Sequence, residues 1–209
     1  MIDVKGLELQ YGRVKEVSFS IAPGECILLA GPNGCGKTTL LKALSHMGVL
    51  IPSGIPKVKG FTVEEFVRTA CYRQSDWAGR HSKAFEGKLE WALELLQIKD
   101  LQNRDISSLS DGEFQKAAIA AGLCMGGPLL MLDEPTSFLD VDNRIMVLRT
   151  LREVAEKTGC SILFTSHDLH DSLEVCHRVL TFATNGTLFE SNKENREEAL
   201  LKAFPTLKL

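Results

Sequence analysis

Residues 31–39, GPNGCGKTT, have the composition and spacing of a phosphate-binding loop, G-x-x-x-x-G-K-[ST], between an apolar run and a helix-like run. The glycines would let the backbone curl so that successive N–H groups face a phosphate chain. Lys37 could reach the β- and γ-phosphates as a candidate catalytic residue, and the Thr38 hydroxyl could bind Mg²⁺. A chance match in a glycine-rich turn is the alternative, which the flanking strand and helix disfavour. The predicted nucleotide-binding residues are Gly31, Pro32, Asn33, Gly34, Cys35, Gly36, Lys37, Thr38 and Thr39.

A pair of acidic residues follows the apolar run LLML in LLMLDEP, residues 129–135. Asp133 would end a buried strand, where a water-bridged contact to Mg²⁺ is expected in a nucleotide site. Glu134 could take a proton from the water that attacks the γ-phosphate. Taken alone, the stretch could equally be an acidic turn before Pro135. The loop at 31–39 favours the catalytic interpretation.

A third stretch, SSLSDGEFQKAAIAAGL at 107–123, places a Ser-Asp-Gly-Glu run before an apolar helix. Ser110 has the character of a helix N-cap, with acidic side chains favoured in the first turn by the helix dipole. Capping alone would explain this composition, so the stretch by itself assigns no function.

The remaining patterns predict strands that alternate with helices. VSFSI at 17–21, ECILLAG at 25–31, PLLMLDEP at 128–135 and CSILFTS at 160–166 are strand-like, and VLTFATNGTLFE carries an Asn-Gly hairpin turn. DNRIMVLRTLREVAEKTG at 142–159 predicts a long helix that ends at Gly159, and residues 48–61 are interpreted as loop. The expected fold is α/β, a P-loop NTPase core with a mainly parallel sheet and N-terminal antiparallel strands.

Residues 62–105 interrupt this alternation with two amphipathic helices, the first of which begins with a capping box from Thr62 to Glu65. The chain is therefore expected to be one domain, residues 1–209, in which 1–61 and 106–209 form the nucleotide-binding core. Residues 62–105 would form a helical subdomain.

The composition and net charge of the chain exclude several classes of function. The chain has 209 residues, 44% of them hydrophobic and 24% charged, as in an ordinary globular domain. The net charge of -3 and the absence of a basic run argue against nucleic acid as a partner. The N-terminus has no signal-peptide pattern, no apolar run is long enough to cross a bilayer, and the six scattered cysteines are typical of reduced cytosolic thiols. A cytoplasmic protein is expected.

With GPNGCGKTT, LSDGE at 109–113, LDEPTSFLD at 132–140 and SHD at 166–168, the sequence resembles the ATP-binding subunits of ABC transporters. The resemblance implies ATP and Mg²⁺ as cofactors and a head-to-tail homodimer formed on ATP binding. In that family each subunit offers the stretch matching LSDGE to the nucleotide of its mate, which would give Ser110 and Gly112 a role in binding ATP. A helix N-terminus is a natural anion site. The usual family form is Leu-Ser-Gly-Gly-Gln, so Asp111 and Glu113 depart from it.

The resemblance also assigns single residues. His167 matches the histidine that contacts the γ-phosphate and helps to hold the attacking water, and Asp140 matches the loop that communicates between the two sites. Tyr11 matches the aromatic that stacks on adenine, although packing within a strand is an equal alternative. The family's usual strand ending in a Mg²⁺-contacting glutamine has no evident counterpart between Gly48 and Phe61. Gln74 is a weak candidate for it, and a surface-loop role is the alternative.

Short segments such as TVEEFVRTACYRQSDWAGRHS most resemble ATPases of importers for iron-siderophores, haem or cobalamin. The leading hypothesis is an ATPase that energises a separate transmembrane permease, with residues 62–105 facing it from the inner face of the membrane. A soluble ABC ATPase without a permease, such as the iron–sulfur cluster assembly type, is the alternative. A nucleotide-binding regulator that does not hydrolyse is disfavoured by the presence of Lys37, Asp133, Glu134 and His167.

Overall fold

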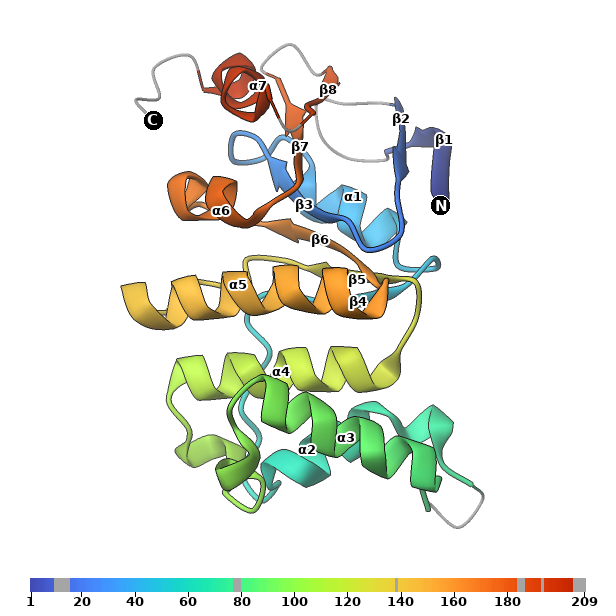
Figure 1. Cartoon of the computed structure of the whole chain (residues 1–209), viewed down its shortest axis with the longest axis vertical. Coiled ribbons are helices and arrows are strands. Elements are labelled where there is room, and N and C mark those ends of the chain that lie inside the picture. Colours follow the sequence, from blue (N-terminus) through green and yellow to red (C-terminus); the bar gives the residue numbers. More distant parts are fainter. Residues whose placement is uncertain (10–15, 77–79, 138, 184–186, 193, 205–209) are drawn as a thin grey trace.

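The computed structural model describes residues 1–9, 16–76, 80–137, 139–183, 187–192 and 194–204. Their order along the chain is shown in Figure 1. The strands are β1 (Ile2–Glu8), β2 (Glu16–Ile21), β3 (Cys26–Ala30), β4 (Val49–Ile51), β5 (Leu129–Leu132), β6 (Ser161–Thr165), β7 (Arg178–Phe182) and β8 (Leu188–Glu190). The helices are α1 (Lys37–Ala43), α2 (Val63–Ala70), α3 (Lys83–Leu95), α4 (Asp111–Met125), α5 (Val141–Thr158), α6 (Leu169–Val175) and α7 (Arg196–Ala203). Short 3₁₀ turns lie at Tyr72–Gln74, Lys99–Leu101 and Ile106–Ser108.

The central sheet has the strand order β4-β5-β6-β3-β7-β8. All its neighbouring strands are parallel except β7 and β8, which pair antiparallel. Strands β1 and β2 form a separate antiparallel pair. The mainly parallel sheet with N-terminal antiparallel strands confirms the predicted α/β fold. The expected Asn-Gly turn between β7 and β8 lies outside the described residues.

Each face of the central sheet packs on a different set of elements. Cys26, Leu28 and Ala30 of β3 face the core shared with α4 and α5. Ile27 and Leu29 of the same strand face the core shared with α1 and the β1–β2 pair. A strand covered on both faces must be apolar at every position, which is why the parallel strands are continuous apolar runs.

The prediction of a loop over residues 48–61 was wrong at its start, since Val49–Ile51 form the edge strand β4 beside β5. Three residues are too few to show the alternation that identifies a strand in a sequence. Gly48 makes the pairing possible, because a Cβ at this position would lie 2.1 Å from the Leu129 carbonyl oxygen.

Helices α2 and α3 pack on α4, on the side of α4 that faces away from α5 (Figure 1). The predicted capping box of α2 is present: Glu65 accepts from the Thr62 backbone N–H at 2.8 Å, and Thr62 Oγ1 accepts from the Glu65 N–H at 3.2 Å. Among the helices of the described residues, none combines the length and apolar character that a bilayer crossing requires. All six cysteines of the chain lie within the described part and are free thiols.

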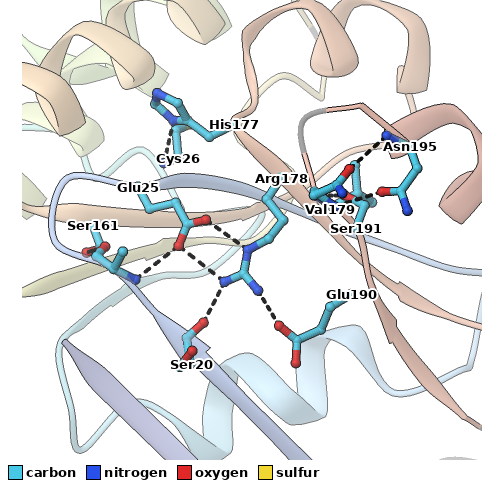
Figure 2. Close-up of polar contacts among 12 residues, drawn as sticks. Ser20, Glu25, Cys26, Ser161, His177, Arg178, Val179, Glu190, Ser191 and Asn195 are labelled. Atoms are coloured by element: carbon cyan, nitrogen blue, oxygen red, sulfur yellow. Dashed lines mark hydrogen bonds and ion pairs between the residues drawn. The ribbon is translucent and has the colours of Figure 1, made fainter.

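Arg178 at the start of β7 ties the two sheets together (Figure 2). Its guanidinium donates to both Glu25 oxygens, at 2.8 and 3.2 Å, and also to Glu190 on β8 and to the Ser20 carbonyl on β2. Arg178 and Glu25 are largely buried, with side chains 14% and 17% exposed. Removing the cation would leave the partly desolvated Glu25 carboxylate with the Ala22 N–H but without its ion-pair partner.

We therefore expect Arg178→Met to lower the free energy of unfolding by about 2 kcal/mol, which corresponds to about 4–8 °C in melting temperature. Arg149→Met, on the exposed surface of α5, is the matched control and should change the melting temperature little. Equal melting curves for the two variants would show that the network around Arg178 contributes no stability.

Candidate functional site

The loop between β3 and α1 has the backbone shape that a phosphate cradle needs. Gly31, Gly34 and Gly36 have φ of 153°, 74° and 114°, values that favour glycine. At Gly31 a Cβ would also lie 2.8 Å from the Cys35 Sγ and 2.9 Å from the Phe182 Cβ. Gly36 precedes α1 and provides no side-chain cap, so the first N–H groups of the helix stay available to an anion.

The Lys37 ammonium is held over this loop. Its Nζ donates to the carbonyl oxygens of Gly31 at 2.8 Å and Pro32 at 3.3 Å. Both acceptors are neutral, and among the described residues no carboxylate lies within ion-pair distance of the Lys37 ammonium. The ammonium is therefore placed to attract a phosphate.

Asp133 connects the loop after β5 to its neighbours on both sides. Its Oδ2 accepts from the Thr38 hydroxyl at 2.8 Å, and its Oδ1 accepts from the Thr165 hydroxyl at 2.8 Å. Thr165 Oγ1 also accepts from the Glu134 N–H at 2.8 Å. Since β3, β5 and β6 are parallel neighbours, these residues meet at the carboxyl edge of the sheet, where ligands bind in open α/β folds.

Glu134 has φ of 55°, in the left-handed region, and is one of two non-glycine residues with positive φ among the described residues. Its backbone is held there by the bond to Thr165 and by Ser137, whose N–H and hydroxyl donate to the Glu134 carbonyl at 3.1 and 2.8 Å. The Glu134 Oε1 lies 3.2 Å from His167 Nε2. A strained backbone held by its neighbours is a mark of a functional position.

Burial raises the pKa of the Glu134 carboxyl above its ordinary value, and the Asp133 charge adds to this effect. His167 and Lys37 act in the opposite direction without cancelling it. The side chain is 16% exposed, so desolvation of the charged form is the dominant cause. A carboxylate with a raised pKa is a stronger base.

This raised pKa predicts a pH dependence of stability. An ionised Glu134 costs stability at pH values above its folded-state pKa, and below the unfolded-state pKa of about 4.3 the cost disappears because both states are protonated. Glu134→Gln should therefore raise the melting temperature near neutral pH, and the gain should vanish as the pH falls to about 4. Calorimetric scans of both proteins across this range test the sign. A gain that persists unchanged in acid would contradict it.

These residues surround one cavity of about 400 Å³, which is within the size range of small-molecule sites. It is lined by Asn33, Gly34, Gly36, Lys37, Thr38, Thr39, Ser53, Asp133, Glu134 and His167. The structure thus brings the predicted catalytic and metal-binding residues together with most of the predicted loop.

The Thr38 and Asp133 oxygens form a donor set that fits Mg²⁺, which prefers oxygen ligands. Within the described part of the chain, no group of three or more acidic, histidine or cysteine residues could hold a metal ion. A cation here would therefore take its other ligands from water and phosphate oxygens, as Mg²⁺ usually does.

Ser110 and Gly112 lie outside this cavity, at the start of α4. Ser110 Oγ accepts from the Glu113 N–H at 3.2 Å, and the Glu113 carboxylate accepts from the Ser110 N–H at 2.8 Å, which makes a complete capping box. The backbone N–H groups of Asp111 and Gly112 have no protein acceptor in the part of the chain that the structure describes. The helix thus begins with two free amide donors at its surface.

Asp140 also lies apart from the cavity and caps α5. Its carboxylate accepts from the Asn143 backbone N–H at 2.8 Å and from the Asn143 side-chain amide at 2.9 Å. These bonds lower the pKa of Asp140. The segment that carries Asp140 lies against the start of α4, since a Cβ on Gly112 would be 3.3 Å from Leu139 Cδ2.

Comparisons with known proteins agree with this geometry. The sequence pattern of the ABC transporter family matches residues 14–137, more than half of the chain. The chain belongs to the ABC transporter ATP-binding family. It is 33% identical over 192 residues to the zinc import ATP-binding protein ZnuC of Roseobacter denitrificans (86% of this chain, 74% of the relative). It is 30% identical over 208 residues to the iron(3+)-hydroxamate import ATP-binding protein FhuC of Bacillus subtilis (85% and 77%).

A solved metal-chelate type ABC transporter in an inward-facing conformation shares the fold. Its TM-score is 0.85 over 97% of this chain and 88% of the other, at 23% sequence identity. The chain is an ATPase of the ABC type, as the family and its import ATP-binding relatives show. The resemblance to siderophore-type import ATPases is confirmed at this level.

The prediction of Gln74 as a weak candidate for the Mg²⁺-contacting glutamine was wrong. Its side-chain amide donates to the carbonyls of Cys124 at 3.1 Å and Met125 at 2.8 Å, so it caps the C-terminal end of α4. Gln74 does not line the cavity. Ser53 does, two residues after β4, at the place where the family is expected to carry its glutamine.

The sequence did not predict Ser53 as a site residue, because the three-residue strand before it was not recognised. Thr165 was not predicted either. Its position directly before the Ser-His-Asp stretch, together with its hydroxyl group, could have indicated a role in the site. The predicted adenine contact Tyr11 lies outside the described residues.

Proposed function

We propose that this chain is the ATP-hydrolysing subunit of an importer and that two copies bind Mg²⁺-ATP between them, head to tail, beneath a transmembrane permease. The observation that carries the proposal is the meeting of Lys37, Thr38, Asp133, Glu134 and His167 around one cavity. The free amides of Asp111 and Gly112 do not line this cavity, so in the proposal one side of the nucleotide site is missing from a single chain. A second copy could supply that side.

In this proposal the loop amides and Lys37 bind the β- and γ-phosphates. Thr38 directly, and Asp133 through water, would hold Mg²⁺, which neutralises charge on the phosphate oxygens. Glu134 accepts the proton of the attacking water, and the raised pKa of its carboxyl favours this step. His167, 3.2 Å from Glu134, orients that carboxylate and contacts the γ-phosphate. The Thr165 hydroxyl bonds to the Asp133 carboxylate and to the Glu134 N–H, and so fixes the positions of these two residues relative to each other.

The cargo is proposed to be an iron-siderophore, haem or cobalamin-like chelate. The short-segment resemblance favours this class, and the relatives named above include an iron(3+)-hydroxamate importer and a zinc importer. Residues 62–105 form the proposed helical subdomain that contacts the permease, and the protein would lie on the inner face of the membrane through that contact.

Two measurements test the proposal. The purified chain should release phosphate from ATP only when Mg²⁺ is present, and Lys37→Ala should lose both activity and ATP affinity because the charge that attracts the phosphates is removed. The chain should also co-purify with a permease from membranes. An active chain that never associates with a membrane protein would favour the soluble alternative.

A further inference from the structure

Lys57 joins the segment after β4 to the start of α4. Its ammonium lies 2.7 Å from Asp111 Oδ1 and donates to the Leu109 carbonyl at 2.7 Å. It also lies 5.8 Å from the centre of the Phe114 ring. Lys57 is the more buried partner, with 24% of its side chain exposed against 65% for Asp111. The cation is therefore positioned by three contacts, and the carboxylate is held by the cation.

Asp111 stands where the family usually has glycine, at the first position of α4, beside the two free amide groups. A carboxylate free to turn toward those amides would compete with a phosphate for them and would repel it. Two like charges a few ångströms apart cost about 1 kcal/mol or more even near a solvated surface. Glu113, the other departure, is already engaged as the second half of the capping box.

We propose that Lys57 is a positioning residue for the nucleotide of the mate: it neutralises Asp111 and holds its carboxylate away, so that phosphate meets the amides of Asp111 and Gly112. This inference rests on the proposed head-to-tail dimer. Ser53, in the same short segment, lines the cavity of its own subunit. One segment would therefore act on both nucleotide sites of the dimer, on its own through Ser53 and on its mate's through the effect of Lys57 on Asp111.

The test uses the full chain with Glu134→Gln, in which hydrolysis is blocked, and measures the ATP-driven dimer dissociation constant by analytical ultracentrifugation. Lys57→Met should weaken each site about tenfold, which is about a hundredfold for a dimer with two such sites. Lys57→Arg should stay close to the parent. Asp111→Asn should dimerise at least as tightly as the parent, because it removes the repulsive charge.

Lys57→Met should weaken ATP-driven dimerisation and Asp111→Asn should not weaken it. This difference distinguishes a positioning role of Lys57 from structural support. If the ion pair only stabilised the fold, both variants would weaken the dimer alike, and that result would overturn the inference. Equal dimerisation of Lys57→Met and the parent would overturn it too. If the Glu134→Gln parent itself stayed monomeric with ATP, the head-to-tail proposal would fail instead. Melting temperatures and ATP affinity of the dilute monomer should be nearly the same in all variants.

Discussion

Glu134→Gln is expected to abolish ATP turnover while ATP binding remains intact. Glutamine has nearly the same shape but cannot accept the proton of the attacking water, and losing a general base typically costs about 10²–10⁴-fold in rate. Because the nucleotides then persist between the subunits, the protein should accumulate as a dimer with ATP and Mg²⁺. Phosphate release measures the first effect, and size-exclusion chromatography measures the second.

Glu198→Gln is a matched control for this variant, since Glu198 is an exposed carboxylate at the start of α7. It should hydrolyse ATP at the parent rate and show no trapped dimer. A Glu134→Gln protein that binds ATP and elutes only as a monomer would count against the head-to-tail arrangement.

Ser110→Arg is expected to stop hydrolysis although its own phosphate-binding loop is untouched. The change destroys the cap of α4 and places a long side chain where the mate's γ-phosphate would approach, so a loss of about a hundredfold or more is expected. The dilute monomer should bind ATP with unchanged affinity, which calorimetry can measure. Full activity of this variant would rule out the proposed contact.

Mixing variants gives a second test of the contact between subunits. A mixed dimer of Ser110→Arg and Lys37→Ala would contain one intact composite site, made of the loop from the first chain and the α4 start from the second. Neither variant alone can form such a site. Phosphate release by the mixed dimer should therefore exceed that of either variant alone, whereas a site completed within one chain predicts no gain.

Local patterns in the sequence were enough to predict the fold class and a phosphate-binding loop at residues 31–39. Apolar runs such as CILLA and SILFT indicate strands that are buried on both faces. The spacing of the glycines in residues 31–39 indicates a loop whose backbone must curl. The capping box of α2, from Thr62 to Glu65, was predictable for the same reason, because all its partners lie within four positions. These signals depend on neighbours in the chain, so a single sequence contains them.

Only the tertiary structure decided the contacts between distant segments. Thr165 reaches Asp133 and Glu134 across 32 and 31 positions, and Gln74 reaches the end of α4 across about 50. Lys57 meets Asp111 because β4 pairs with β5 inside the sheet and α4 packs on β4. Hydrophobic periodicity records which face of an element is buried and not which element covers it, so these partners became visible only once the sheet order brought them together.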